Sequence, residues 1–142
     1  MNVMIFDTFP VPSEIVEKFD IRVATMDEII ENADFISLHV PLTKETQNLI
    51  STEELSRMKP NAVLINTARG GIVNEEALYG ALKNKTIRSA YFDVFTCEPP
   101  RADEPLLTLN NFYLTPHIAS RSAEAEKNTA DIATRVILDA LK

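Results

Sequence analysis

The sequence predicts an α/β fold built on a parallel, doubly wound sheet of about five to six strands. Six short apolar runs are rich in β-branched or aromatic side chains, which is typical of strands that are covered on both faces. Polar, amphipathic segments separate these runs. Strand and helix therefore alternate along the chain, and this alternation favours parallel strands with helices on both faces of the sheet.

The six apolar runs are the predicted strands. They occupy residues 3–6, 21–23, 35–40, 62–65, 90–94 and 112–114. Pro41 follows the third run and Pro116 follows the sixth. Because proline has no backbone N–H to donate to a sheet ladder, both strands are expected to end there.

Helix-capping residues open the segments between the runs. The predicted caps are Ser13, Thr25, Ser51 and Asn74. Thr25 and Ser51 are each followed three residues later by a glutamate, which is the capping-box pattern. The last segment, residues 122–141, is the longest and has apolar residues at helical spacing.

Composition limits the class of protein. The 142 residues fit one domain, 1–142, ending in a long helix. The net charge of −7 argues against a nucleic-acid or anionic-lipid partner. The single Cys97 excludes a disulfide framework and a cysteine-rich metal site, and three glycines exclude a GxGxxG or GxxxxGK loop. With no signal peptide and no apolar run of about 20 residues, we expect a cytoplasmic protein without a membrane partner.

Polar residues gather where the predicted strands end. They include Asp7, Arg69, Asp93 and His117, with Glu98 just beyond the fifth strand. Ligands of open parallel sheets bind beyond the carboxyl ends of the strands. Position alone therefore indicates a site at this edge. We interpret His39, inside the third run, as a packed and hydrogen-bonded structural histidine.

Three longer motifs resemble the D-isomer-specific 2-hydroxyacid dehydrogenases. They are Ile65 to Asn74 (INTARGGIVN), Phe92 to Pro99 (FDVFTCEP) and Leu114 to Ser120 (LTPHIAS). Their order and spacing are family-like, and the HVPLT stretch at residues 39–43 also matches. The resemblance covers essentially the whole chain, and the phosphoglycerate dehydrogenase branch is the most similar.

The resemblance implies that the chain corresponds to the C-terminal part of such an enzyme. Family members are about twice as long and have two domains. The substrate-binding domain has no counterpart here, nor do the first strand, GxGxxG turn and helix of the Rossmann-type NAD-binding domain. We therefore expect a truncated Rossmann-like domain.

The resemblance also implies roles for three catalytic residues. The histidine at His117 acts as acid and base on the C2 oxygen of a 2-hydroxy acid, and the glutamate at Glu98 holds its imidazole. The arginine at Arg69 binds the substrate carboxylate through its planar guanidinium. The alternatives are a histidine that ends an edge strand, a glutamate before a proline turn and a surface arginine.

The implied cofactor is NAD, with no metal. An acid at Asp7 accepts hydrogen bonds from the adenosine ribose and disfavours a 2′-phosphate, although an aspartate that caps a turn is the alternative. Asp93 resembles the residue that faces the nicotinamide amide. The positions that match cofactor contacts are Val40, Thr67 and Ala68, together with Arg69 and His117.

Two hypotheses for function stay open. The chain is either part of an oxidoreductase that transfers hydride between a D-2-hydroxy acid and NAD, or a non-catalytic folded or oligomerising fragment with half of a cofactor site. We expect the isolated chain to be inactive and to bind NAD weakly or not at all, because the pyrophosphate loop is missing. We also expect a homodimer, because the last helix needs a cover for its apolar face; a helix folded back on the sheet is the alternative.

The absent central strand leads to one prediction about topology. Runs 3–6 and 35–40 would border the gap that this strand leaves, and unpaired strand edges are costly. We expect the two runs to pair directly, which gives the flavodoxin-like order 2-1-3-4-5 with the sixth strand beyond. A strand supplied by a second chain is the alternative.

Overall fold

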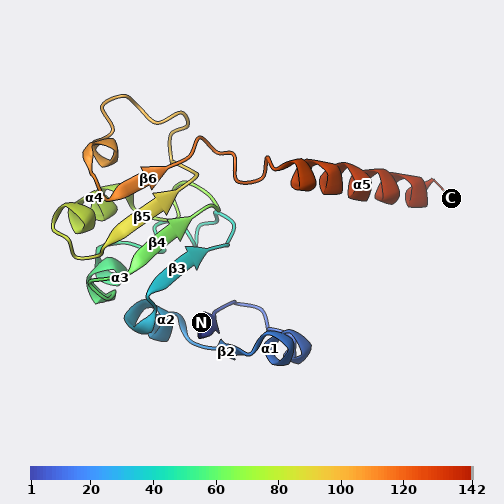
Figure 1. The fold of residues 1–142 in the computed structure, drawn as a ribbon, viewed down its shortest axis with the longest axis horizontal. Coiled ribbons are helices and arrows are strands. Elements are labelled where there is room, and N and C mark those ends of the chain that lie inside the picture. Colours follow the sequence, from blue (N-terminus) through green and yellow to red (C-terminus); the bar gives the residue numbers. More distant parts are fainter. Residues whose placement is uncertain (142) are drawn as a thin grey trace.

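The computed structural model describes residues 1–141 as an α/β fold with six parallel strands (Figure 1). The strands are β1 (Val3–Ile5), β2 (Ile21–Val23), β3 (Phe35–Leu38), β4 (Val63–Asn66), β5 (Ser89–Phe92) and β6 (Phe112–Leu114). The helices are α1 (Ser13–Phe19), α2 (Met26–Asn32), α3 (Thr52–Arg57), α4 (Glu75–Lys83) and α5 (Ala123–Ala140). A 3₁₀ helix, Pro105–Thr108, precedes β6 and was not anticipated from the sequence.

Strands β3 to β6 form one parallel sheet in sequence order. Ile36, Leu64, Ala90 and Phe112 stand in register across it and are all buried. Leu55 of α3 and Leu78 and Leu82 of α4 belong to the same apolar cluster. This cluster holds the four strand ends, and with them the turns of the candidate site, in fixed relative positions.

The opposite face of this sheet is largely open. Phe35, Tyr91 and Tyr113 are 64%, 44% and 48% exposed, and the two tyrosine rings stack 4.6 Å apart. Connections that step along a sheet in one direction with the usual right-handed crossover put their helices on one face. The prediction of helices on both faces is therefore wrong for this sheet within residues 1–141.

The predicted closure of the sheet is also wrong. β1 pairs only with β2 in a separate two-stranded sheet, so the described chain has no β1–β3 ladder and no single 2-1-3-4-5 order. Helix α2, which leads from β2 into β3, is paired with α3. Arg57 pairs with Asp27 and Glu31 at 2.7 and 2.8 Å. β1 also spans only three residues, so closing the gap would add few ladder bonds.

Local capping agrees with most of the sequence analysis. The Thr25 hydroxyl accepts the Glu28 backbone N–H, and the Glu28 carboxylate accepts that of Thr25, so this capping box is confirmed. Asn74 caps α4 by accepting the Ala77 N–H at 2.9 Å. Ser13 is instead the first residue of α1, and its predicted role as a side-chain cap is wrong.

The last helix runs away from the rest of the molecule (Figure 1). Within residues 1–141, α5 has no buried side chain. Its four largest apolar side chains, and Leu141 just after it, are 55–79% exposed; the four are Ile132, Val136, Ile137 and Leu138. No helix of the described residues is both long and apolar enough to cross a bilayer.

Candidate active site

The turn after β4 is held by a buried asparagine. The Asn66 side chain, only 1% exposed, accepts the Ala68 N–H at 3.1 Å and donates to the Arg69 carbonyl at 3.0 Å. These bonds set the path of residues 67–69 at the carboxyl edge of the sheet. The Arg69 guanidinium folds onto the Ala68 carbonyl at 2.6 Å. Asn66 belongs to the motif at residues 65–74, but the sequence analysis did not identify this role.

This turn faces the segment that follows β3. The two segments form the walls of an open hollow with a volume of about 640 Å³. Its lining residues are His39, Val40, Pro41, Leu42, Thr67, Ala68 and Arg69. Three predicted cofactor positions, Val40, Thr67 and Ala68, therefore share one hollow with Arg69. His39 is exposed at its rim and lies 2.8 Å from the Ser37 hydroxyl through Nε2. It is hydrogen-bonded as expected, but it is not packed.

A second group of predicted residues meets beyond β5 and β6. The Glu98 Oε2 lies 2.7 Å from His117 Nδ1, and the Glu98 Oε1 accepts the Phe95 backbone N–H at 2.9 Å. The bond with His117 first, and that with Phe95 second, hold the pKa of Glu98 below its usual range. A carboxylate on Nδ1 fixes the imidazole ring and leaves Nε2 for another partner.

The backbone at His117 is unusual. Its φ is +54°, in the left-handed region that histidine adopts only occasionally. Such a conformation costs about 1–3 kcal/mol and persists where surrounding bonds impose it. Outliers of this kind cluster at functional sites. Among the described residues, four non-glycine residues have a positive φ, and His117 is the one of them that the sequence analysis placed in the site; the others are Asp20, Asn48 and Lys85.

Asp93 supplies the bonds that impose this conformation. Its buried carboxylate accepts the Thr115 hydroxyl and the backbone N–H groups of Ile118 and Ala119, the last two at 2.9 and 2.8 Å. Burial raises the pKa of Asp93, but these hydrogen bonds outweigh burial and leave the pKa below its ordinary value. Asp93 therefore anchors the segment on both sides of His117.

Asp7 is the predicted residue that joins neither group. It follows β1, outside the four-stranded sheet, and its Oδ1 accepts the Phe9 N–H at 2.9 Å. This bond is the turn-capping alternative considered from the sequence. Asp7 does not line the hollow beside Arg69.

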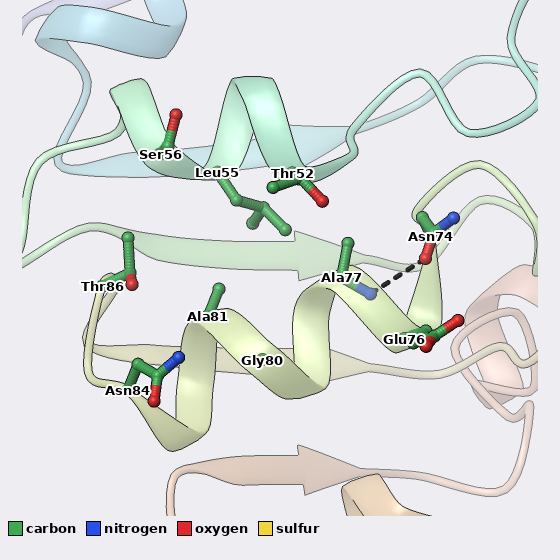
Figure 2. Close-up of a pocket in the computed structure, with 10 residues that line it drawn as sticks. All are labelled: Thr52, Leu55, Ser56, Asn74, Glu76, Ala77, Gly80, Ala81, Asn84 and Thr86. Atoms are coloured by element: carbon green, nitrogen blue, oxygen red, sulfur yellow. Dashed lines mark hydrogen bonds between the residues drawn. The ribbon is translucent and has the colours of Figure 1, made fainter.

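A second hollow lies between α3 and α4, away from these residues (Figure 2). It has a volume of about 440 Å³ and is lined mainly by small or uncharged side chains, with Glu76 as its one acid. Asn74 at its end already caps α4, as the dashed line in Figure 2 shows. The hollow therefore brings no reactive pair together.

Residues 1–119 match the family described as D-isomer specific 2-hydroxyacid dehydrogenase, NAD binding domain. The chain belongs to this family. It is 43% identical over 143 aligned positions to a D-3-phosphoglycerate dehydrogenase of Methanocaldococcus jannaschii, covering 100% of this chain and 27% of that protein. It is 48% identical over 117 positions to a glyoxylate reductase of Thermofilum pendens, covering 82% of this chain and 34% of that protein.

Solved structures agree with the family assignment. A glyoxylate reductase from Paecilomyes thermophila superposes with a TM-score of 0.89 at 29% identity, over 100% of this chain and 42% of that one. The NAD-complexed D-isomer specific 2-hydroxyacid dehydrogenase from Lactobacillus delbrueckii ssp. bulgaricus gives 0.86 at 29% identity, over 99% and 45%. The chain thus spans less than half the length of these relatives and has a Rossmann-type fold.

Proposed function

We propose that this chain is the part of an NAD-dependent D-2-hydroxyacid dehydrogenase that carries the catalytic acid and base. The observation that supports this most is the His117–Glu98 pair, 2.7 Å apart and held at the carboxyl edge of the sheet by Asp93. A histidine with a carboxylate on Nδ1 and a usable Nε2 suits proton transfer at a hydroxyl or carbonyl oxygen.

Each predicted residue then has a distinct part. His117 takes a proton from the C2 hydroxyl of the acid through Nε2, or returns it to a 2-oxo acid in the reverse direction. Glu98 orients the imidazole by accepting from its Nδ1. Arg69 swings from the Ala68 carbonyl to bind the substrate carboxylate with its planar fork.

The hollow beside Arg69 fits part of a dinucleotide. When NAD is bound it accepts the hydride from C2, and the protein supplies orientation. Val40, Thr67 and Ala68 would contact the nicotinamide half, and Asp93 would receive the carboxamide N–H on Oδ2, which takes only the Ala119 bond among those described above. Asp7 would accept hydrogen bonds from the adenosine ribose hydroxyls, and its present bond from the Phe9 N–H would weaken.

A chimaera tests this function. The 43% identical D-3-phosphoglycerate dehydrogenase supplies the flanking sequence, and this chain replaces the aligned 143 positions. We expect NAD-dependent oxidation of a D-2-hydroxy acid, with His117→Ala lowering kcat by about 10²–10⁴-fold. Glu98→Gln and Arg69→Ala should also lower turnover. An active chimaera in which His117→Ala has no effect would exclude the proposed role of His117.

For the isolated 142-residue chain, we propose inactivity and weak cofactor binding. The chain has three glycines and none in a GxGxxG pattern, so it offers no loop for the pyrophosphate. Losing several kcal/mol from a micromolar site leads to a dissociation constant of about 1 mM or more. Calorimetric titration with NADH measures this constant, and a micromolar value would contradict the proposal. A cytoplasmic location stays a prediction.

A further inference from the structure

Helix α4 is bonded to the loop that carries Glu98. Glu75, its first residue, lies half-buried and accepts two hydrogen bonds through Oε1. One comes from the Thr96 backbone N–H at 2.7 Å and the other from the Thr96 hydroxyl at 2.9 Å. A charged acceptor strengthens both bonds. The two residues are 21 positions apart, so this contact joins separate parts of the site.

Thr96 stands inside the short turn that presents Glu98. Within this turn, the Glu98 carboxylate accepts a hydrogen bond from the Phe95 backbone N–H. Two contacts with other segments of the chain hold the turn in place. One is the Glu75–Thr96 pair, and the other is Gly70, where a Cβ would lie only 1.9 Å from the Phe95 carbonyl oxygen. The direction of the Glu98 carboxylate therefore depends on where α4 holds Thr96.

We propose that Glu75 is a positioning residue, which holds Thr96 so that Glu98 meets Nδ1 of His117. The importance of this role for catalysis rests on the proposed function. The hydrogen bonds from which we infer the role do not depend on that proposal. Glu75 joins the start of α4 to the Glu98 loop, and the close approach of Gly70 to Phe95 adds the Arg69 turn, so the three segments form one unit before any substrate arrives.

Glu76 offers a matched comparison. It is also an acid in the first turn of α4, and it therefore interacts equally well with the helix dipole. Its side chain lines the hollow between α3 and α4 (Figure 2), and the Thr96 bonds described above go to Glu75 alone. A general effect of acidic residues on α4 would make the two glutamates equivalent, whereas the proposal makes only Glu75 important.

The test is the ¹⁵N NMR spectrum of the His117 imidazole in the 142-residue chain, at a pH where the ring is neutral. Glu98 accepting from Nδ1 fixes the proton on Nδ1, so one tautomer dominates in the wild type. We expect Glu75→Ala to lose this pattern and give mixed tautomers. Glu75→Gln keeps an acceptor oxygen and should retain it, as should Glu76→Ala. His39 is the only other histidine, and His39→Gln assigns the signals.

Equal spectra for Glu75→Ala and Glu76→Ala would overturn the proposal. If Glu75→Ala fails to fold, Thr96→Val decides, because it removes only the hydroxyl bond. A smaller shift towards mixed tautomers then supports the role of Glu75, and an unchanged spectrum refutes it. The measurement needs neither NAD nor substrate, so its failure is distinct from an inactive chimaera.

Discussion

Gly70 and Gly80 have opposite surroundings. A Cβ on Gly70 would lie 1.9 Å from the Phe95 carbonyl oxygen and 2.4 Å from the Thr96 nitrogen, both backbone atoms that cannot simply turn aside. A Cβ on Gly80, within α4, meets nothing within 4 Å. The same substitution therefore probes two different physical effects.

We expect Gly70→Ala to lower the free energy of unfolding by about 3 kcal/mol or more, because the Glu98 loop must move away. Gly80→Ala should raise it by about 0.5–1 kcal/mol, because alanine loses less conformational entropy in a helix. Urea denaturation of both variants measures the difference. A harmless Gly70→Ala would mean that the two turns are not in close contact.

Asp93 shows how one buried carboxylate organises the candidate site. The pKa of Asp93 is lower in the folded chain than its ordinary 3.8, because three hydrogen bonds outweigh burial. The stabilisation is thus fully present above about pH 5 and is lost as the pH falls through the folded pKa.

Asp93→Asn tests this linkage. The amide replaces one accepting oxygen by a donor, so we expect a loss of about 1–3 kcal/mol at pH 6. The variant should then lose less additional stability between pH 6 and pH 3 than the wild type. Urea denaturation across this range gives both quantities. Parallel pH profiles would show that Asp93 does not contribute to acid sensitivity.

Much of the site follows from residue types at strand ends. Arg69, Asp93, Glu98 and His117 were identified because parallel strands bring their carboxyl ends to one edge. In the sequence, Glu75 is simply the acid that follows the predicted cap Asn74, and its bond to Thr96 spans 21 residues. No periodicity or spacing encodes such a contact, so only the folded arrangement reveals it.

The helices differ in what covers them. α3 and α4 bury Leu55, Leu78 and Leu82 in the common core, whereas α5 buries no side chain within residues 1–141. Its apolar residues occur at helical spacing, as the sequence predicted. A large exposed apolar stripe is rare in monomers, so we propose association into a homodimer through this helix.

Ile137→Glu tests the association surface. Ile137 is 60% exposed on α5, and a buried unpaired glutamate is costly in an interface. We expect sedimentation analysis to show a wild-type dimer and a monomeric variant. Asn128→Glu is the matched control, because nine residues place it about two and a half turns away, on the opposite side of the helix. A wild type that stays monomeric at high concentration would contradict the proposal.

At the scale of the whole molecule, the two sheets differ in how much of each is buried in the apolar core. The four-stranded sheet has the buried cluster on one face. β1 and β2 form a separate pair, in which Met4 touches that cluster while Val23, and Phe6 just after β1, are about half exposed. A two-stranded pair is marginally stable by itself. The edges of β1 and β3 that the sequence predicted would meet remain apart.

Amide hydrogen exchange should reflect this difference. We expect the amides of β1 and β2 to exchange faster than those of β4, because they open locally at a lower free energy. Leu64 in β4 is fully buried and serves as the reference for the core. Equal protection of the two sheets would mean that the β1–β2 pair shares the stability of the core.

The amino-acid pattern alone was enough for the strands, most helix caps, the family and the strand-end residues of the candidate site. These features arise from neighbouring residues, such as the Thr25–Glu28 capping box, or from motifs a few residues long. Three features were visible only in the tertiary structure. They are the separation of β1 from β3, the open sheet face that carries Phe35 and Tyr113, and the Glu75–Thr96 bond. Each depends on which distant segments pack together, and that choice is made by the free energy of the whole chain and not by any short stretch of sequence.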